Sequence, residues 1–288
     1  MKKKFHAYQT RQQMLSKDYE IFHYSDLKLN KVYLHHHDFY ECYLFISGNV
    51  SYYIEGKTYT LIPGDIILVD TTELHQLIVK DHSVPYERIV LWINKQFLDN
   101  LSTDKTNLSE CFSSKEDNVI RLSFELQQNI RTILHKLISI DNYEGIGSDI
   151  LYKAYIIELF VQLNMILKHS LIKPDLEIKK SLLLNDIIEY INDHIDEEIP
   201  VDRLSEHVFL SKYHLLREFK KQSGTTIHKY IVQKKLILAK ELILKGIPVL
   251  DVYKQCGFGD YSNFFRAFKK EYGVTPKSFY ALINRTGT

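Results

Sequence analysis

One helical pattern occurs twice in the last third of the chain, and no other feature limits the fold as strongly. The first copy lies between Val201 and Gly224, and the second between Val249 and Tyr280. Six residues recur 49 positions apart: Leu215, Arg217, Phe219, Lys220, Lys221 and Gly224 match Phe264, Arg266, Phe268, Lys269, Lys270 and Gly273. A fixed repeat of this kind indicates one supersecondary unit that is used twice.

Each copy has the pattern of two short helices joined by a tight turn. In the second copy, apolar residues at helical spacing lie on both sides of Gly257, which can adopt the positive φ of such a turn. Asp260 can cap a second helix over Tyr261–Tyr272, and Gly273 can end that helix. This is the form of a helix-turn-helix, whose second helix can enter the major groove of DNA.

The two copies resemble the paired DNA-binding subdomains of the AraC/XylS family of transcription regulators, over about Leu182 to Tyr280. The motifs that carry the resemblance are Leu210-Ser211-Lys212-Tyr213-His214-Leu215, Arg217, Phe219-Lys220-Lys221, Cys256-Gly257-Phe258, Ser262-Asn263-Phe264, Arg266, Phe268-Lys269-Lys270, Gly273 and Thr275-Pro276. The chain departs from the family at Ser205 and Tyr253, where a small alanine is usual. The bulky Tyr253 affects the expected packing of the second copy.

The polar residues of the two recognition helices are the candidates for DNA contact, since the Leu and Phe residues at i and i+4 pack inward. Arg217 and Arg266 are the best candidates for reading bases, because a guanidinium can make two hydrogen bonds to guanine. Contact with phosphate alone is the alternative. Lys221 and Lys270 are expected to bind phosphates, which sets affinity more than sequence preference. The other candidates are Ser211, Lys212, Tyr213, His214, Tyr261, Ser262 and Asn263.

A long helix is predicted between the two copies, over Ile227 to Lys245. At 1.5 Å per residue its length is about 28 Å, which suits two recognition helices in successive major grooves of one duplex, about 34 Å apart. Leu216 and Phe265 can meet thymine methyl groups or belong to the core, and the core is favoured. Double-stranded DNA is therefore the expected partner of this domain.

Charge and cysteine usage agree with this division. Residues 199–288 hold 16 Lys and Arg against 7 Asp and Glu, whereas the rest of the chain holds 21 against 29. A basic third on an acidic body is typical of a nucleic-acid module joined to a sensory domain. Cys42, Cys111 and Cys256 form no CxxC pair, which favours reduced thiols in the cytoplasm. No run of about 18 apolar residues occurs, so no membrane span is expected.

The region from about Ile21 to Trp92 is rich in β-branched and aromatic residues, in short runs separated by turns such as Ser47-Gly48-Asn49 and Pro63-Gly64-Asp65. The predicted strands are 32–34, 41–46, 50–54, 58–61, 65–69 and 88–92. Many short strands favour a sandwich or barrel. The order of the motifs resembles the cupin sensor domain of the same family. The fold class is therefore α+β: a cupin-like β-barrel with following helices, and an all-α domain with two helix-turn-helix subdomains.

Five residues are predicted to bind a ligand: His35, His37, Glu41, Tyr43 and His75. The spacing His-x-His-x3-Glu-x6-Gly matches the first half of the metal-binding cupin motif, whose ligands suit a transition metal. The second half fails, because Gly64 follows Pro63 directly and the next histidine downstream is His75. An organic ligand is therefore expected, with no metal and no cofactor. A three-ligand metal site with His75 turned inward, and polar residues without a ligand role, remain the alternatives.

The predicted boundaries are an N-terminal arm at 1–20, the cupin-like domain at 21–100, a helical dimerisation and linker region at 101–170, and the DNA-binding domain at 178–284. The helix-turn-helix units are expected at about 201–222 and 249–272. Helices over Phe124–Ile140 and Ser148–Lys168 carry broad apolar faces. The resemblance implies that such helices make dimer contacts, and packing against the chain's own barrel is the competing interpretation.

The resemblance implies a ligand-responsive, sequence-specific transcription regulator in the cytoplasm. It further implies a homodimer that activates carbohydrate-related genes, contacts RNA polymerase and takes a small effector such as a sugar. Trp92, Tyr52 and Tyr43 can stack on a sugar ring, although aromatic residues on strands are more often core. The competing hypotheses are a metal-dependent cupin enzyme with an accessory helical domain and a nonspecific nucleoid protein. No catalytic residues, and no membrane partner, are expected.

Overall fold

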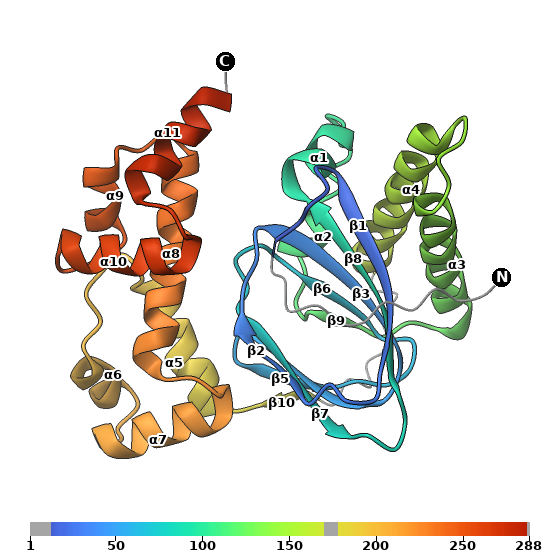
Figure 1. Cartoon of the computed structure of the whole chain (residues 1–288). Helices are drawn as coiled ribbons and strands as arrows, with labels where there is room; N and C mark the ends of the chain where they lie inside the picture. Colours follow the sequence, from blue (N-terminus) through green and yellow to red (C-terminus); the bar gives the residue numbers. More distant parts are fainter. Residues whose placement is uncertain (1–12, 170–177, 287–288) are drawn as a thin grey trace. The chain divides into compact units, whose positions relative to one another are not determined.

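A computed structural model describes residues 13–169 and 178–286 (Figure 1). The chain divides into two compact units, Met1–Lys179 and Lys180–Thr288. Residues 1–12 of the predicted N-terminal arm lie outside the described residues, as do residues 170–177 of the segment expected to link the domains.

The first unit contains two five-stranded sheets. The first sheet has the order β1 (Tyr19–Asp26), β8 (Tyr86–Asn94), β3 (Phe39–Ser47), β6 (Ile66–Val69) and β9 (Val119–Ile120). The second has the order β10 (Ile178–Lys180), β5 (Lys57–Thr60), β4 (Asn49–Ile54), β7 (His75–Asp81) and β2 (Lys31–His35). The expected cupin-like domain is confirmed. Strands β1, β7, β9 and β10 were not among the six predicted.

The central strand β3 is buried on both faces, and its side chains alternate between two cores as the pleat requires. Tyr43 and Phe45 pack in the core between the two sheets. Cys42 and Leu44 belong to a second core on the opposite face of the same sheet. Because both faces carry apolar side chains, the sheet needs a cover on its outer side.

Four helices follow β8 in the described part of the first unit: α1 (Lys95–Leu101), α2 (Glu110–Ser113), α3 (Phe124–Asp141) and α4 (Ser148–Lys168). Figure 1 shows α3 and α4 as an antiparallel pair beside the first sheet. Ile133 of α3 and Leu159 of α4 lie in the same core as the outward side chains of β3. Of the two interpretations of these helices, packing against the chain's own barrel is therefore observed.

Helix α4 is longer and more apolar than this packing requires. Its length and composition would allow it to cross a membrane, but a core helix of a globular domain meets the same criterion. Only 28% of its most apolar window is buried. One stripe of side chains at spacings of three and four lies exposed or half-buried: Ile150, Ala154, Ile157, Val161 and Met165. Of these, Val161 also packs against the core.

The second unit is helical, as expected from its sequence. Its helices are α5 (Leu182–Asp193), α6 (Val201–His207), α7 (Lys212–Ser223), α8 (Ile227–Leu244), α9 (Val249–Gln255), α10 (Tyr261–Tyr272) and α11 (Pro276–Thr286). Helices α6 and α7 form the first helix-turn-helix, α9 and α10 the second, and α8 connects them. The side chains of Ser211 and Asp260 cap α7 and α10, and Gly224 and Gly273 end these helices in the left-handed conformation.

A buried lysine holds the two helix-turn-helix units together. Lys235 of α8 is 5% exposed, and its Nζ donates to the carbonyl of Glu197, at 2.6 Å, and to that of Gly257. Glu197 precedes α6, and Gly257 follows α9. The carbonyls of two distant turns thus converge on one ammonium group, and such charge-assisted bonds are among the stronger hydrogen bonds in proteins.

Gly257 allows this close approach. Its φ is +64°, and a Cβ built on it would lie 2.2 Å from the carbonyl oxygen of Glu197. Gly246, at the end of α8, has a similar φ of +82° but nothing within 4 Å of its built Cβ. The two positions therefore separate the effect of the backbone conformation from the effect of the contact.

We predict that Gly257→Ala destabilises the protein clearly more than Gly246→Ala. Both variants place a side chain in the left-handed region, at a cost of about 1–2 kcal/mol. Only Gly257→Ala also forces a methyl group against a backbone carbonyl. Thermal unfolding of the helical signal, followed by circular dichroism, measures both changes. Equal losses would show that the contact with Glu197 contributes nothing.

Candidate functional site

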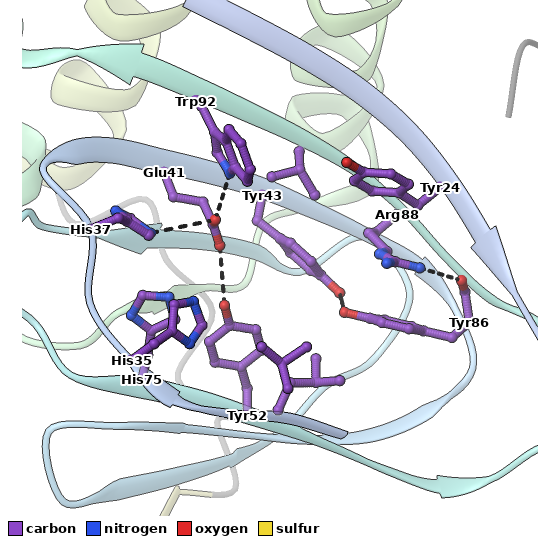
Figure 2. Close-up of a pocket in the computed structure, with 13 residues that line it drawn as sticks. Tyr24, His35, His37, Glu41, Tyr43, Tyr52, His75, Tyr86, Arg88 and Trp92 are labelled. Atoms are coloured by element: carbon purple, nitrogen blue, oxygen red, sulfur yellow. Dashed lines mark hydrogen bonds and ion pairs between the residues drawn. The ribbon is translucent and has the colours of Figure 1, made fainter. Parts of the chain in front are cut away.

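A polar pocket lies inside the barrel of the first unit (Figure 2). Its volume is about 60 Å³, which is room for several waters, since one water needs roughly 10–15 Å³. The lining residues are Tyr24, Val32, His35, His37, Glu41, Tyr43, Tyr52, His75, Leu77, Tyr86, Arg88, Val90 and Trp92. All five residues predicted to bind a ligand are among them, and what they bind stays a prediction.

Strand pairing brings the five residues together from distant parts of the sequence. The alternation of β3 turns Glu41 and Tyr43 toward the space between the sheets. Glu41 pairs with Trp92 across β3 and β8, so their side chains share one face. His35 at the end of β2 pairs with His75 at the start of β7. The failed spacing after Pro63 therefore does not keep His75 out of the pocket.

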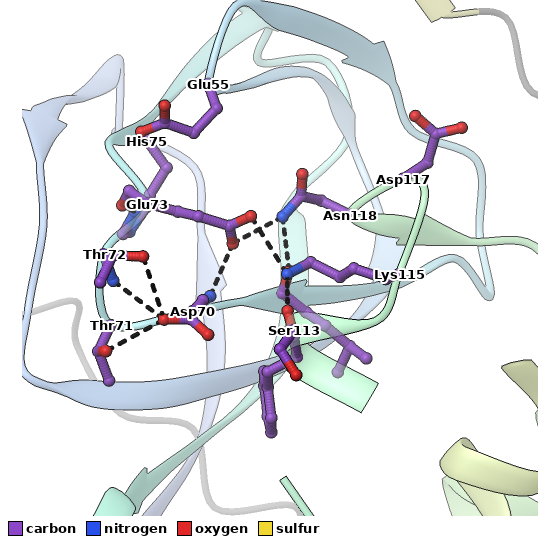
Figure 3. A network of polar contacts seen from close by, with 12 residues as sticks. Glu55, Asp70, Thr71, Thr72, Glu73, His75, Ser113, Lys115, Asp117 and Asn118 are labelled. Atoms are coloured by element: carbon purple, nitrogen blue, oxygen red, sulfur yellow. Dashed lines mark hydrogen bonds and ion pairs between the residues drawn. The ribbon is translucent and has the colours of Figure 1, made fainter. Parts of the chain in front are cut away.

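The loop before β7 is held by a polar network that fixes the position of His75 (Figure 3). The carboxylate of Glu73 accepts hydrogen bonds from the backbone N–H of Asp70, at 2.7 Å, and from the side chain of Asn118, at 2.8 Å. It also forms an ion pair of 3.1 Å with Lys115. The backbone carbonyl of Glu73 in turn accepts from His75 Nδ1 at 3.0 Å.

The three pocket histidines share one hydrogen-bond arrangement. Each ring pairs Nδ1 with a backbone carbonyl two residues away, at 2.8 Å for His35, 2.8 Å for His37 and 3.0 Å for His75. A carbonyl only accepts, so Nδ1 carries the hydrogen in each ring. In the neutral ring the lone pair is then on Nε2.

Glu41 supplies the negative charge of the pocket. Its two oxygens accept from the Tyr52 hydroxyl, at 3.1 Å, and from Trp92 Nε1, at 2.8 Å. Oε2 also lies 3.6 Å from His37 Nε2. Burial raises the pKa of Glu41, but the neighbouring His37, followed by the charges of His75 and His35, outweighs burial and lowers the pKa to about 2.

Burial acts in the opposite direction on two of the imidazoles. It lowers the pKa of His35 to about 4, with a further decrease from the neighbouring His37. Burial, followed by the charges of His35 and His37, lowers the pKa of His75 well below its usual value. At neutral pH the pocket therefore holds an ionised carboxylate beside neutral rings of His35 and His75.

A second polar group of the pocket was missed by the sequence reasoning. The buried Arg88 donates to the carbonyl of Tyr86 at 3.1 Å and forms an ion pair with Asp26. Its guanidinium lies over the rings of Tyr24, at 4.6 Å, and Tyr86, at 4.2 Å. The hydroxyl groups of Tyr43 and Tyr86 share a hydrogen bond. The available signal was an arginine in the otherwise apolar strand 88–92.

The residues predicted to contact DNA lie on the outer faces of α7 and α10. Those that are exposed are Ser211, Lys212, Tyr213, Arg217, Lys221, Ser262, Asn263, Arg266 and Lys270, whereas His214 and Tyr261 are half-buried. The inward residues Leu215, Phe219, Phe264 and Phe268 are buried. Leu216 is 41% exposed, so its assignment to the core is wrong: it lies on the solvent side of α7 beside Arg217.

The two arginines are oriented by neighbours on their own helices. Arg266 donates to the side-chain oxygen of Asn263 at 2.7 Å. Asn263 is in turn bonded to Asp260, the N-cap of α10. In the first helix-turn-helix, Arg217 lies 3.4 Å from His214 Nδ1. Both guanidinium groups therefore stand near the N-terminal part of a recognition helix, where base contacts are made in helix-turn-helix proteins.

The chain matches two protein families: an AraC-like ligand binding domain over residues 22–160 and a helix-turn-helix domain over residues 204–281. It is similar to the HTH-type transcriptional activator RhaS of Salmonella paratyphi A, with 25% identity over 244 residues, 84% of this chain and 85% of RhaS. RhaS of Salmonella typhimurium gives the same identity and coverage.

Among solved structures, ToxT of Vibrio cholerae with a bound unsaturated fatty acid aligns over 93% of this chain and 96% of its own, at 14% identity and a TM-score of 0.40. The two family matches together cover most of the chain, one in each unit. The chain therefore belongs to the AraC family of transcription regulators, with a ligand-binding domain and a helix-turn-helix DNA-binding domain, and it is not an enzyme.

Proposed function

We propose that this regulator activates transcription when a small polar effector, such as a sugar, occupies the barrel pocket. The observation that carries the proposal is the pocket itself (Figure 2), in which Glu41, Arg88 and several tyrosine hydroxyls face one cavity inside the ligand-binding domain. Hydroxyl groups of a sugar can pair with such polar groups, and aromatic rings such as Trp92 can pack on its apolar face. The similarity to the transcriptional activator RhaS supports activation. We further propose that the regulated genes are carbohydrate-related and that the protein acts in the cytoplasm.

DNA recognition is proposed to use both helix-turn-helix units at once. The exposed side chains of Arg217 and Arg266 read base edges in successive major grooves, while Lys221 and Lys270 bind phosphates. The contacts of Lys235 with the carbonyls of Glu197 and Gly257 hold the two helix-turn-helix units together. Contact of the bound activator with RNA polymerase then raises transcription.

Dimer formation is proposed to use the outer stripe of α4. The residues Ile150, Ala154, Ile157, Val161 and Met165 recur at spacings of four and three, which is the pattern of a helix seam against a second helix. A second copy of the same stripe is the simplest partner, because closed pairs with twofold symmetry are the commonest oligomers. The region 101–170 would then act in dimerisation as well as in the core of its own unit.

We expect Arg217→Ala and Arg266→Ala each to cost about 1–3 kcal/mol of binding to the operator and to relax base preference at one position. The reason is the loss of a two-bond contact with a base edge. Fluorescence anisotropy with operator and scrambled duplexes measures both effects.

Lys221→Ala and Lys270→Ala are the matched controls, one on each recognition helix. They should weaken binding to both duplexes equally and lower the slope of log affinity against log salt by about one. An arginine variant that behaves like the lysine variants would make that arginine a phosphate contact.

The effector proposal is tested by footprinting the operator with a panel of sugars and by titrating the same compounds against the fluorescence of Trp92. The active compound should bind Glu41→Gln at least about tenfold more weakly, since a hydrogen bond to a charged group contributes about 1.5–3 kcal/mol. Glu158→Gln, exposed on α4, should leave the affinity unchanged. A panel without any response would remove the sugar from the proposal.

The dimer proposal predicts that Ile157→Lys converts the protein to monomers in sedimentation velocity. The new ammonium group would lie in the interface next to the same group of the second copy and to apolar side chains, so the dimer would bury two like charges. The adjacent Glu158→Lys, exposed and outside the stripe, should remain dimeric. Dimers of both variants would exclude this face of α4.

A further inference from the structure

We propose that His35, His37 and His75 form a binding site for one divalent transition-metal ion inside the barrel pocket. Each ring can offer one nitrogen, and these three nitrogens lie within 4.8 Å of one another. His35 and His37 are close in sequence, but His75 comes from a different strand. The three imidazoles thus come from the end of β2, the connection after it and the start of β7, and they line the same end of the pocket (Figure 2).

The hydrogen bonds of the rings leave the correct atom available in each case. Because every Nδ1 pairs with a backbone carbonyl, each neutral ring directs its lone pair through Nε2. A metal-binding histidine usually has this arrangement, in which the second nitrogen donates to a carbonyl or carboxylate and fixes the ring. The backbone therefore orients all three rings before any ligand arrives.

Two of these Nε2 atoms, those of His37 and His75, are buried acceptors without a hydrogen bond among the described residues. An unsatisfied buried polar atom costs about 1–3 kcal/mol, so native structures rarely keep two in one place. A ligand that accepts both lone pairs removes the penalty, and a cation satisfies this requirement.

The geometry needs only a small adjustment. A tetrahedral ion about 2.1 Å from each nitrogen places the nitrogens about 3.4 Å apart. The three candidate nitrogens lie within 4.8 Å of one another, so the rings need to turn and bring these atoms closer together. The ring centres are 4.2 Å apart for His35 and His75, 4.9 Å for His37 and His75, and 6.0 Å for His35 and His37.

The surrounding charges favour a cation as well. The carboxylate of Glu41 lies 3.6 Å from His37 Nε2 and is held by Tyr52 and Trp92. It can compensate part of the ion's charge from outside the set of ligands, as a partner of His37. Imidazole and carboxylate together suit zinc, iron, nickel or cobalt more than magnesium or calcium.

This site also narrows the class of effector, a step that rests on the proposed function. Three protein ligands leave at least one position of a tetrahedral ion open. An effector with neighbouring oxygen donors, such as a vicinal diol or a hydroxy acid, can occupy it while its other groups meet the tyrosines of the pocket. The metal here would bind the effector and orient it, without any reaction.

The test uses the full-length protein, freed of metal with a chelator and titrated with Co²⁺ and then Zn²⁺. We expect one equivalent of Co²⁺ per chain, with the visible absorbance of a low-symmetry site, and its displacement by Zn²⁺. His35→Ala and His75→Ala should each weaken binding more than about 100-fold, beyond the loss caused by removing an outer contact. The exposed His82→Ala is the control for binding by surface imidazoles.

Circular dichroism and operator binding verify that each variant is folded, and His35→Asn replaces His75→Ala if the latter does not fold. Binding of cobalt that is equal in the wild type and in folded His35 variants would overturn the proposal, as would the absence of stoichiometric binding. If the protein binds one metal ion but does not respond to any compound of the effector panel, only the proposal of an effector in this pocket is contradicted. If the response to an effector is unchanged in chelated protein, only the role of the metal in effector binding is contradicted.

Discussion

The double burial of β3 is the constraint on which the first unit depends. One face of this strand carries Glu41 and Tyr43 into the pocket, while the other carries Cys42 and Leu44 into the core shared with α3 and α4. Close-packed interiors transmit displacement because they contain few voids. A ligand that moves β3 therefore acts on the helices behind it through one layer of side chains, provided that it binds the two states differently.

The pocket is a charged region inside an otherwise apolar barrel, and its polar groups are separated. The ionised Glu41 and the imidazoles stand at one end, and Arg88, paired with Asp26, stands at the other. Tyr43 reaches from the strand of Glu41 to the hydroxyl of Tyr86, beside Arg88. Opposite charges at two ends give a bound molecule a preferred direction, which an apolar cavity of the same size would lack.

Local signals predicted the helical unit well. The boundaries expected for 261–272 and 148–168 agree with α10 and α4, because helical periodicity and caps such as Asp260 lie within a few residues of each other. The sequence predicted the pocket only in part. It named His75, which the pairing of β7 with β2 carries into the pocket, but it missed Arg88, which reaches the pocket through the pairing of β8 with its neighbours. Such pairings join residues that are distant in sequence, and motif spacing does not encode them.

Lys235 has a consequence for the DNA that this protein can accept. Its ammonium group binds the carbonyl of Glu197, in the connection before α6, and that of Gly257, in the turn of the second helix-turn-helix. Burial lowers the pKa of Lys235 without removing these bonds. The two recognition helices then keep a fixed distance and orientation relative to each other. One inserted base pair rotates the second half of a binding site by about 35° around the duplex axis. Two recognition helices held at a fixed distance cannot follow that rotation. The protein therefore binds only DNA in which the two sequences that it reads have one particular spacing.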